Sequence, residues 1–181
     1  MIKIVYFVHG TTTDNEEGRA TGWNPGYLSE KGKQQSLNLR SLINIDDFDY
    51  VFSSDLKRAL DSAFIALGGI GGKNITYAPK IRECNYGELN GRSCDLINYS
   101  EHIDVPFPRG ECLLDVEKRV RDFLDYLLEK YDGKTIALMS HKAPQLALDV
   151  ITKNISWNEA IEQDWRKTGD WQPGWVYEIE K

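Results

Sequence analysis

An unbroken run of β-branched and aromatic residues opens the chain between Lys3 and Val8 and predicts a buried strand. The run breaks at His9 and Gly10, and hydroxyl and amide side chains such as Thr11 and Asn15 follow. Open α/β sheets bind their ligands at the carboxyl ends of strands, glycine lets the backbone approach a ligand, and hydroxyl and amide groups donate to anions. This stretch therefore predicts either a ligand site at His9 or a strand whose histidine only caps a turn.

Strand-like and helical segments alternate along the rest of the chain, and no repeat or internal domain boundary is evident. Short apolar runs predict four further strands, over residues 49–53, 75–77, 135–139 and 175–179. Helical patterns predict helices over residues 29–43, 54–66 and 113–131, from about residue 144, and over 156–167. This alternation predicts an α/β fold, a three-layer α/β/α sandwich with a mostly parallel sheet, in one domain over residues 1–181.

Several helix ends carry recognisable signals. The predicted N-caps are Ser29, then Ser54 or Asp55, and finally Ser156, which forms a capping-box pattern with Glu159. The glycine-rich run over residues 68–72 ends the second helix. We interpret it as a hinge or loop, because it follows a helix and lacks the Lys-Ser/Thr ending of a phosphate-binding loop. Residues 79–110 show little periodicity and predict mostly loop, with one short helix.

Composition narrows the classes of function. The 181-residue chain is 41% hydrophobic and 28% charged, as is ordinary for a globular domain, and its net charge of −6 argues against nucleic acid as the main partner. No apolar run approaches a membrane span, and the first residues lead straight into a strand and not into a signal peptide. Three cysteines without a C-x-x-C pair suit a reducing cytoplasm, and three widely spaced histidines give no metal-site spacing. We expect a cytoplasmic protein without a metal or other cofactor.

Two predicted strands end in the same way, with His9 after the first and His141 after the strand over residues 135–139. A third strand end, at Ser53, leads Arg58 into the first turn of a helix. A parallel sheet brings these ends to one edge, where two imidazoles, a guanidinium and helix N-termini together form an anion site.

Six segments, in this order along most of the chain, carry a resemblance to a known family. They are residues 7–12 (FVHGTT), 22–35 (GWN to LSEKGKQQ), 53–59 (SSDLKRA), 81–91 (IRECNYGELNG), 108–111 (PRGE) with Arg119, and Ser140-His141. Together they resemble the histidine phosphatase superfamily, also called phosphoglycerate mutase-like. The match at residues 53–59 is the most complete of the six.

The resemblance implies a reaction through a phosphorylated histidine. His9 is the expected nucleophile, and water then hydrolyses the phosphohistidine. Arg58 and His141 are expected to hold the phosphoryl oxygens, and Glu83 to protonate the leaving oxygen. The expected phosphate or substrate contacts come from Gly10, Thr11, Asn15, Arg58 and Lys142, and neither metal nor cofactor is required.

The sequence departs from the family pattern at Val8, where the family has an arginine that forks onto the phosphate. By analogy with the loss of one preorganised donor, the penalty is ~10²–10³ in rate if nothing compensates. The candidate replacement charges are Lys142, Arg19 and Arg82. The alternative is a weak or lost activity on an intact fold.

We therefore expect a phosphomonoester hydrolase whose partner is a small phosphorylated metabolite, with neither nucleic acid nor membrane as a partner. A phosphoglycerate mutase is the first alternative, disfavoured because only a short polar segment lies between Gly91 and Pro106. A catalytically impaired phospho-ligand binding protein is the second, motivated by Val8. A Ser-His-Asp hydrolase is remote, since no G-x-S-x-G elbow is present. The tryptophans of residues 165–175 predict packing, with stacking on an organic substrate as the alternative.

Overall fold

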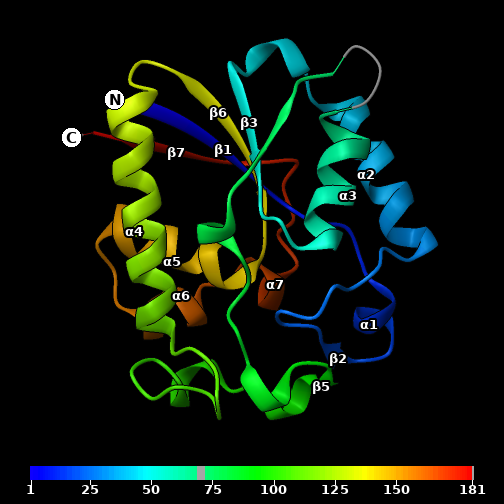
Figure 1. The fold of residues 1–181 in the computed structure, drawn as a ribbon, viewed down its shortest axis with the longest axis vertical. Coiled ribbons are helices and arrows are strands. Elements are labelled where there is room, and N and C mark those ends of the chain that lie inside the picture. Colours follow the sequence, from blue (N-terminus) through cyan, green and yellow to red (C-terminus); the bar gives the residue numbers. More distant parts are fainter. Residues whose placement is uncertain (69–71, 181) are drawn as a thin grey trace.

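A five-stranded sheet runs through the middle of the molecule (Figure 1). The computed structural model describes residues 1–68 and 72–180. The strands are β1 (Ile2–Val8), β3 (Tyr50–Ser53), β4 (Ile75–Tyr77), β6 (Thr135–Ser140) and β7 (Trp175–Ile179), in the order β4-β3-β6-β1-β7. The first four are mutually parallel, and β7 pairs antiparallel with β1 at the sheet edge. This arrangement confirms the predicted fold class.

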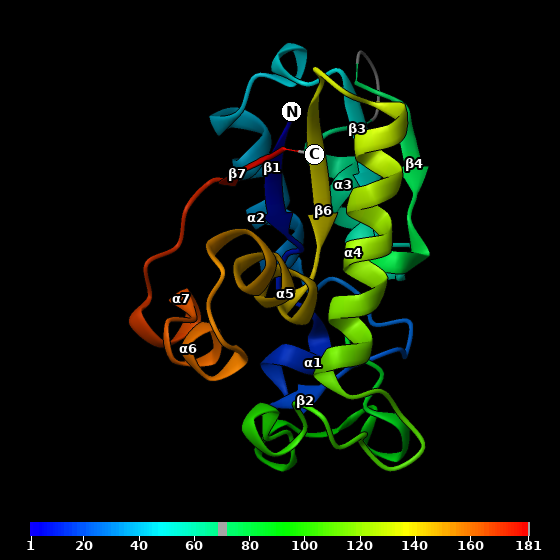
Figure 2. The ribbon, with the colours of Figure 1, turned by 90° about the vertical axis from the view of Figure 1, so that its left-hand side faces the viewer.

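Helices cover both faces of the sheet (Figures 1 and 2). One face carries α2 (Glu30–Leu42) and α3 (Lys57–Ala66), and the other carries α4 (Leu113–Lys130) and α5 (Lys142–Lys153). Two shorter helices, α6 (Trp157–Glu162) and α7 (Trp165–Thr168), follow α5 on its side of the sheet. The strand ends that precede α3 and α5 therefore lie at one edge, beneath helix N-termini.

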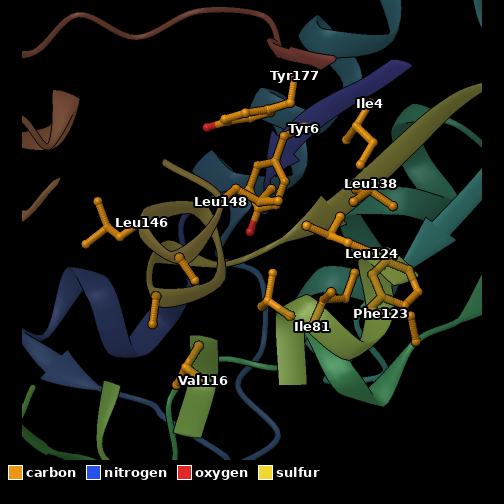
Figure 3. Packing of buried hydrophobic residues seen from close by; sticks show 14 of the residues in the cluster. Ile4, Tyr6, Ile81, Val116, Phe123, Leu124, Leu138, Leu146, Leu148 and Tyr177 are labelled. Atoms are coloured by element: carbon orange, nitrogen blue, oxygen red, sulfur yellow. The ribbon is translucent and has the colours of Figure 1, made fainter. Parts of the chain in front are cut away.

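The two faces of β1 belong to two different apolar clusters, as the period-two geometry of a strand requires. Ile4 and Tyr6 pack in the larger cluster, on the side of α4 and α5, whereas Phe7 packs with α2 and α3. Figure 3 shows Tyr6 of β1 beside Tyr177 of β7, with the apolar residues of α5 below them. The ring centroids of Tyr6 and Tyr177 are 6.4 Å apart, in an edge-to-face arrangement. Packing on both sides fixes the end of β1, which carries His9.

Small elements form a layer beyond the carboxyl ends of the strands (Figure 1). They comprise α1 (Thr13–Glu16) and a two-stranded ribbon of β2 (Arg19–Ala20) with β5 (Arg92–Ser93). The segment predicted to be mostly loop with one short helix contains β5 and four single-turn 3-10 helices, at Pro79–Ile81, Gly87–Leu89, Cys94–Leu96 and Tyr99–Glu101. Single turns lack the periodicity that makes a helix visible in a sequence.

The N-cap predicted for α3 was wrong. Leu56 occupies that position without a side-chain cap, because the two predicted candidates have other partners. Asp55 pairs with Arg82, and Ser54 bonds to His141. The N-cap prediction for α2 is confirmed, since Ser29 Oγ accepts from the N–H of Gly32 at 3.2 Å.

The single helix predicted over residues 156–167 is instead two helices. The capping box of Ser156 and Glu159 is present at the start of α6, but the chain breaks at Asp164, which is the N-cap of α7. Asp164 Oδ1 accepts from the backbone N–H of Arg166 at 3.2 Å, and the residue is only 3% exposed. An aspartate competes with helix hydrogen bonds in this way and favours a new helix start.

The remaining boundaries lie close to their predictions. Helix α5 begins at Lys142, two residues before the predicted start, with His141 at its N-cap. Of the glycine-rich run, residues 69–71 lie outside the described residues. Over the described ranges, every helix is too short or too polar to cross a membrane.

Candidate active site

The carboxyl ends of β1, β3 and β6 bring together the three side chains predicted to meet there. The ring centroids of His9 and His141 are 5.0 Å apart. Arg58, in the first turn of α3, donates from Nε to Nε2 of His9 at 3.3 Å. The predicted convergence is therefore present, and all three groups lie where the N-termini of α3 and α5 approach the sheet edge.

One hydrogen bond defines the tautomer of His9. Its Nδ1 lies 2.7 Å from the carbonyl oxygen of Gly10, which only accepts, so Nδ1 carries the proton. Nε2 therefore holds a lone pair, which accepts from Arg58. Burial, followed by the nearby charge of Arg58, lowers the pKa of His9 to about 3. The ring is neutral at physiological pH, as a nitrogen nucleophile must be.

His141 is fully buried and held from two sides. The hydroxyl of Tyr6 donates to its backbone carbonyl at 2.7 Å and accepts from its backbone N–H at 3.1 Å. Nε2 of the ring lies 2.8 Å from Ser54 Oγ. Burial and the charge of Arg58 hold the pKa of His141 well below its ordinary range. Among the described residues, Nδ1 of this ring has no hydrogen-bond partner.

Arg58 is 2% exposed, and the loop before α2 fixes its guanidinium. Nη1 donates to the carbonyl of Asn24 at 3.1 Å, and Nη2 donates to that of Gly22 at 2.8 Å. Burial lowers the pKa of Arg58, whose ordinary value is so high that the group stays charged. The positive charge beside His9 is therefore preorganised and does not have to reorient when an anion arrives.

Glu83 lies against the N-terminus of α5 and is 7% exposed. Its Oε1 accepts from the backbone N–H groups of Cys84 at 2.9 Å and Ala143 at 3.0 Å, and its Oε2 accepts from that of Lys142 at 3.2 Å. Arg119 donates to the Glu83 carbonyl at 2.9 Å, which secures this irregular segment. The carboxyl group is thus held rigidly at the same sheet edge as the histidines.

The predicted phosphate contacts in the loop after β1 lie at the site, but their backbone N–H groups have protein partners. Gly10 N–H donates to Ser62 Oγ at 3.0 Å, and Thr11 N–H donates to Gln35 Oε1 at 2.8 Å. Asn15 Oδ1 accepts from the N–H of Thr12 at 3.0 Å and so caps α1. Only the NH2 group of this amide can donate to an anion.

The three residues predicted to replace the charge missing at position 8 have different surroundings. Arg82 donates from Nε to Asp55 at 2.7 Å and stacks on Trp23. Arg19 pairs with Asp14 at 3.0 Å. Lys142 Nζ lies 3.0 Å from Asp164 and above the ring of Tyr99. Of these, Arg19 and Lys142 line the same pocket as His9, and Arg82 does not.

That pocket has a volume of about 1010 Å3 and contains Arg166, which the sequence did not indicate. Trp165 and Arg166 of α7 line it together with Val8, His9 and Glu83. No local pattern marks Arg166, because its approach depends on how α7 folds back toward β1. In the described part of the chain, no three His, Cys, Asp or Glu side chains gather as a metal-binding group.

Comparisons with known proteins agree with this geometry. The model of the histidine phosphatase superfamily (branch 1) matches residues 5–169. The chain belongs to this superfamily. The family's phosphoglycerate mutase-like members are among its relatives, as the resemblance implied.

Curated relatives carry both mutase and phosphatase names. The chain is 29% identical to "Probable phosphoglycerate mutase GpmB" of Escherichia fergusonii, over 78% of this chain and 70% of that protein. It is 27% identical to "Phosphoserine phosphatase 1" of Hydrogenobacter thermophilus, over 82% and 74% of the two chains.

A solved structure shares the fold. It is a phosphoserine phosphatase mutant (H9A) from Entamoeba histolytica in complex with phosphoserine, with a TM-score of 0.76 and 23% identity. The similarity covers 90% of this chain and 85% of that one. It supports the α/β/α architecture and its topology.

Proposed function

We propose that the protein is a phosphomonoester hydrolase that acts on a small phosphorylated metabolite through a phosphohistidine at His9, without a metal. The tautomer of His9 carries this proposal. A neutral ring whose Nδ1 hydrogen is bonded to Gly10 and whose Nε2 lone pair faces Arg58 supports nucleophilic attack at physiological pH.

In the first step, Nε2 of His9 forms a bond to phosphorus while the bond from phosphorus to the ester oxygen breaks. The carboxylic acid form of Glu83 gives its proton to that oxygen, which leaves as an alcohol. Arg58 stabilises the charge that is redistributed over the phosphoryl oxygens. His141 donates a hydrogen bond from Nδ1 to a phosphoryl oxygen. Its Nδ1 carries a hydrogen when the hydroxyl of Ser54 donates to Nε2.

In the second step, water attacks phosphorus and passes a proton to the Glu83 carboxylate. The bond from phosphorus to Nε2 breaks, its electron pair returns to His9, and inorganic phosphate leaves. Three backbone N–H groups, at 84, 142 and 143, hydrogen-bond to the Glu83 side chain and hold it in place for this transfer. In the same proposal, Gly10, Thr11, Asn15 and Lys142 supply the remaining contacts to the phosphate or the substrate.

A phosphoglycerate mutase is the second candidate, because the relative from Escherichia fergusonii carries that name. A mutase returns the phosphoryl group to a substrate hydroxyl, whereas a hydrolase transfers it to water. The products distinguish the two directly, since only hydrolysis accumulates inorganic phosphate. A binding protein that only holds phosphate esters would show neither product.

The test is hydrolysis of p-nitrophenyl phosphate by the wild-type protein and by His9→Ala, in EDTA. The proposal predicts steady release of phosphate by the wild type and a loss of ~10³-fold or more in the variant. Equal rates in the two proteins would contradict it. Absence of turnover in the wild type, with phosphate esters still bound, would favour the binding protein.

A further inference from the structure

Position 8 faces the side of the sheet that α5 covers. Side chains alternate along a strand, so Val8 shares a face with Tyr6, whose hydroxyl binds the backbone of His141. Val8 also packs against the larger apolar cluster and lines the pocket that contains His9. The strand itself therefore brings no charge to this wall of the pocket, whereas Arg58 comes from the α3 side.

Helix α7 is anchored to the same face of β1. Trp175 of β7 pairs with Tyr6 in the sheet, and Trp165 of α7 stacks on Trp175 with 5.0 Å between ring centroids. Trp165 Nε1 also donates to Gln145 Oε1 at 3.1 Å, and Gln145 is 1% exposed within α5. These contacts place the first turn of α7 over the end of the strand that carries Val8.

The second residue of α7, Arg166, is held by three groups in this position. Nη1 lies 2.9 Å from Asp164 Oδ1, Nη2 donates to Gln145 Oε1 at 3.1 Å, and the guanidinium lies 4.4 Å from the ring centroid of Trp165. Asp164 and Gln145 are both buried. Arg166 lines the same pocket as Val8 and His9, so its guanidinium is oriented by a built site and is not a free surface charge.

The local charge balance leaves this wall positive. The Asp164 carboxylate pairs with two cations, Arg166 at 2.9 Å and Lys142 at 3.0 Å, so one negative charge faces two positive ones. The charge of Arg166 also lowers the pKa of His9 and of His141, although burial and the charge of Arg58 lower both pKa values more.

We infer that Arg166 binds the phosphoryl group from the α7 side of the pocket, opposite Arg58, and supplies the charge that Val8 does not. This inference rests on the proposed binding of a phosphate ester at His9. Lys142 shares the Asp164 carboxylate but offers a point charge, whereas the guanidinium presents a planar pair of donors suited to two phosphoryl oxygens.

The test combines removal and relocation of the guanidinium. Arg166→Met is expected to lower kcat/KM for p-nitrophenyl phosphate by ~10²–10³-fold, and Arg166→Lys by less, since the charge remains. Because Val8 lines the same wall, Val8→Arg in the Arg166→Met background is expected to recover about tenfold or more of the loss. Arg121→Met is the matched control, since Arg121 is exposed on α4, away from the residues that line the pocket, and pairs with Glu117.

A direct titration separates this inference from the proposed function. In a calorimetric titration, we expect inorganic phosphate to bind to Arg166→Met with an affinity at least about tenfold lower than to the wild type. If the wild type shows no turnover, the proposed function fails and the titration still decides the role of Arg166. Unchanged phosphate affinity and turnover in Arg166→Met would overturn this inference but not the proposed function. A double variant as weak as Arg166→Met would also overturn it, because Arg166 would then act through the fold of α7.

Discussion

Arg58 donates from Nε to Nε2 of His9 across 3.3 Å. The same nitrogen of His9 holds the lone pair that the proposed reaction uses, because Nδ1 is bonded to the Gly10 carbonyl at 2.7 Å. A fixed cation beside a neutral nucleophile opposes protonation of the ring and attracts the anionic substrate. The two residues come from different strand ends, β1 and β3, so the sheet itself creates this relationship.

The role proposed for Glu83 makes the effect of Glu83→Gln depend on the leaving group. An alkyl phosphate releases a strongly basic oxygen that needs a proton, and we expect a loss of ~10²–10⁴-fold in kcat with such a substrate. p-Nitrophenolate leaves without a proton, so the first step with p-nitrophenyl phosphate should change much less. Burst-phase kinetics with the two substrates measures this difference.

Glu88→Gln is the control for that comparison, because Glu88 pairs with the exposed Arg109. It should leave both substrates unaffected. An equal loss of the first step with both leaving groups in Glu83→Gln would contradict the proton transfer.

The buried histidines make stability depend on pH. The pKa of His9 is about 3 in the folded chain, against an ordinary value near 6.5. As the pH falls below 6.5, the unfolded chain takes up a proton that the folded chain does not, so the free energy of unfolding decreases. Between pH 7 and pH 5 the expected loss is about 2 kcal/mol for His9. His141 acts in the same direction, since its pKa is also lowered.

Urea denaturation at pH 7, 6 and 5 measures this dependence. Protonation of carboxylates with a lowered pKa, such as Asp55, decreases the free energy of unfolding mainly below about pH 4. The change between pH 7 and pH 5 therefore reports on the histidines. His9→Asn should show a smaller decrease over the same window. A wild-type stability that rises as the pH falls from 7 to 5 would be incompatible with two buried neutral histidines.

Gly10 is required by packing. A β-carbon there would collide with the carbonyl oxygen of Gly32 in α2, and backbone cannot move aside. We expect Gly10→Ala to lower the free energy of unfolding by about 1–3 kcal/mol, measured by urea denaturation. Gly68→Ala is the control, because its added carbon first meets the flexible end of Ile75 at 3.1 Å. Equal losses in the two variants would contradict this account of Gly10.

Much of the site's framework could be predicted from the sequence. His9 and His141 each follow an apolar run, and the parallel sheet places both runs side by side. Arg58 follows the end of β3 in the same way. The convergence of these three residues needed only strand order and the rule that parallel strands end at one edge. Glu83 lies in an irregular segment, so only the family resemblance indicated it.

The C-terminal wall could not be predicted, for a physical reason. The stretch over residues 156–167 has a helical pattern, and the prediction of one helix missed the break at Asp164. That break depends on burial of Asp164, which pairs with both Lys142 and Arg166. Arg166 is close to Asp164 in the sequence, but Lys142 is distant, so no local pattern reveals the pairing. Since α7 is only four residues long, the position of Arg166 follows from tertiary contacts and not from local periodicity.

The most direct measurement is detection of phosphate on His9 itself. The protein is mixed with a phosphate monoester, quenched in alkali, where phosphohistidine survives, and digested for mass spectrometry. The account predicts a phosphoryl group on the peptide that contains His9, formed no more slowly than turnover and absent in His9→Ala. Turnover without any phosphorylated His9 peptide, or with the phosphoryl group on another residue, would contradict it.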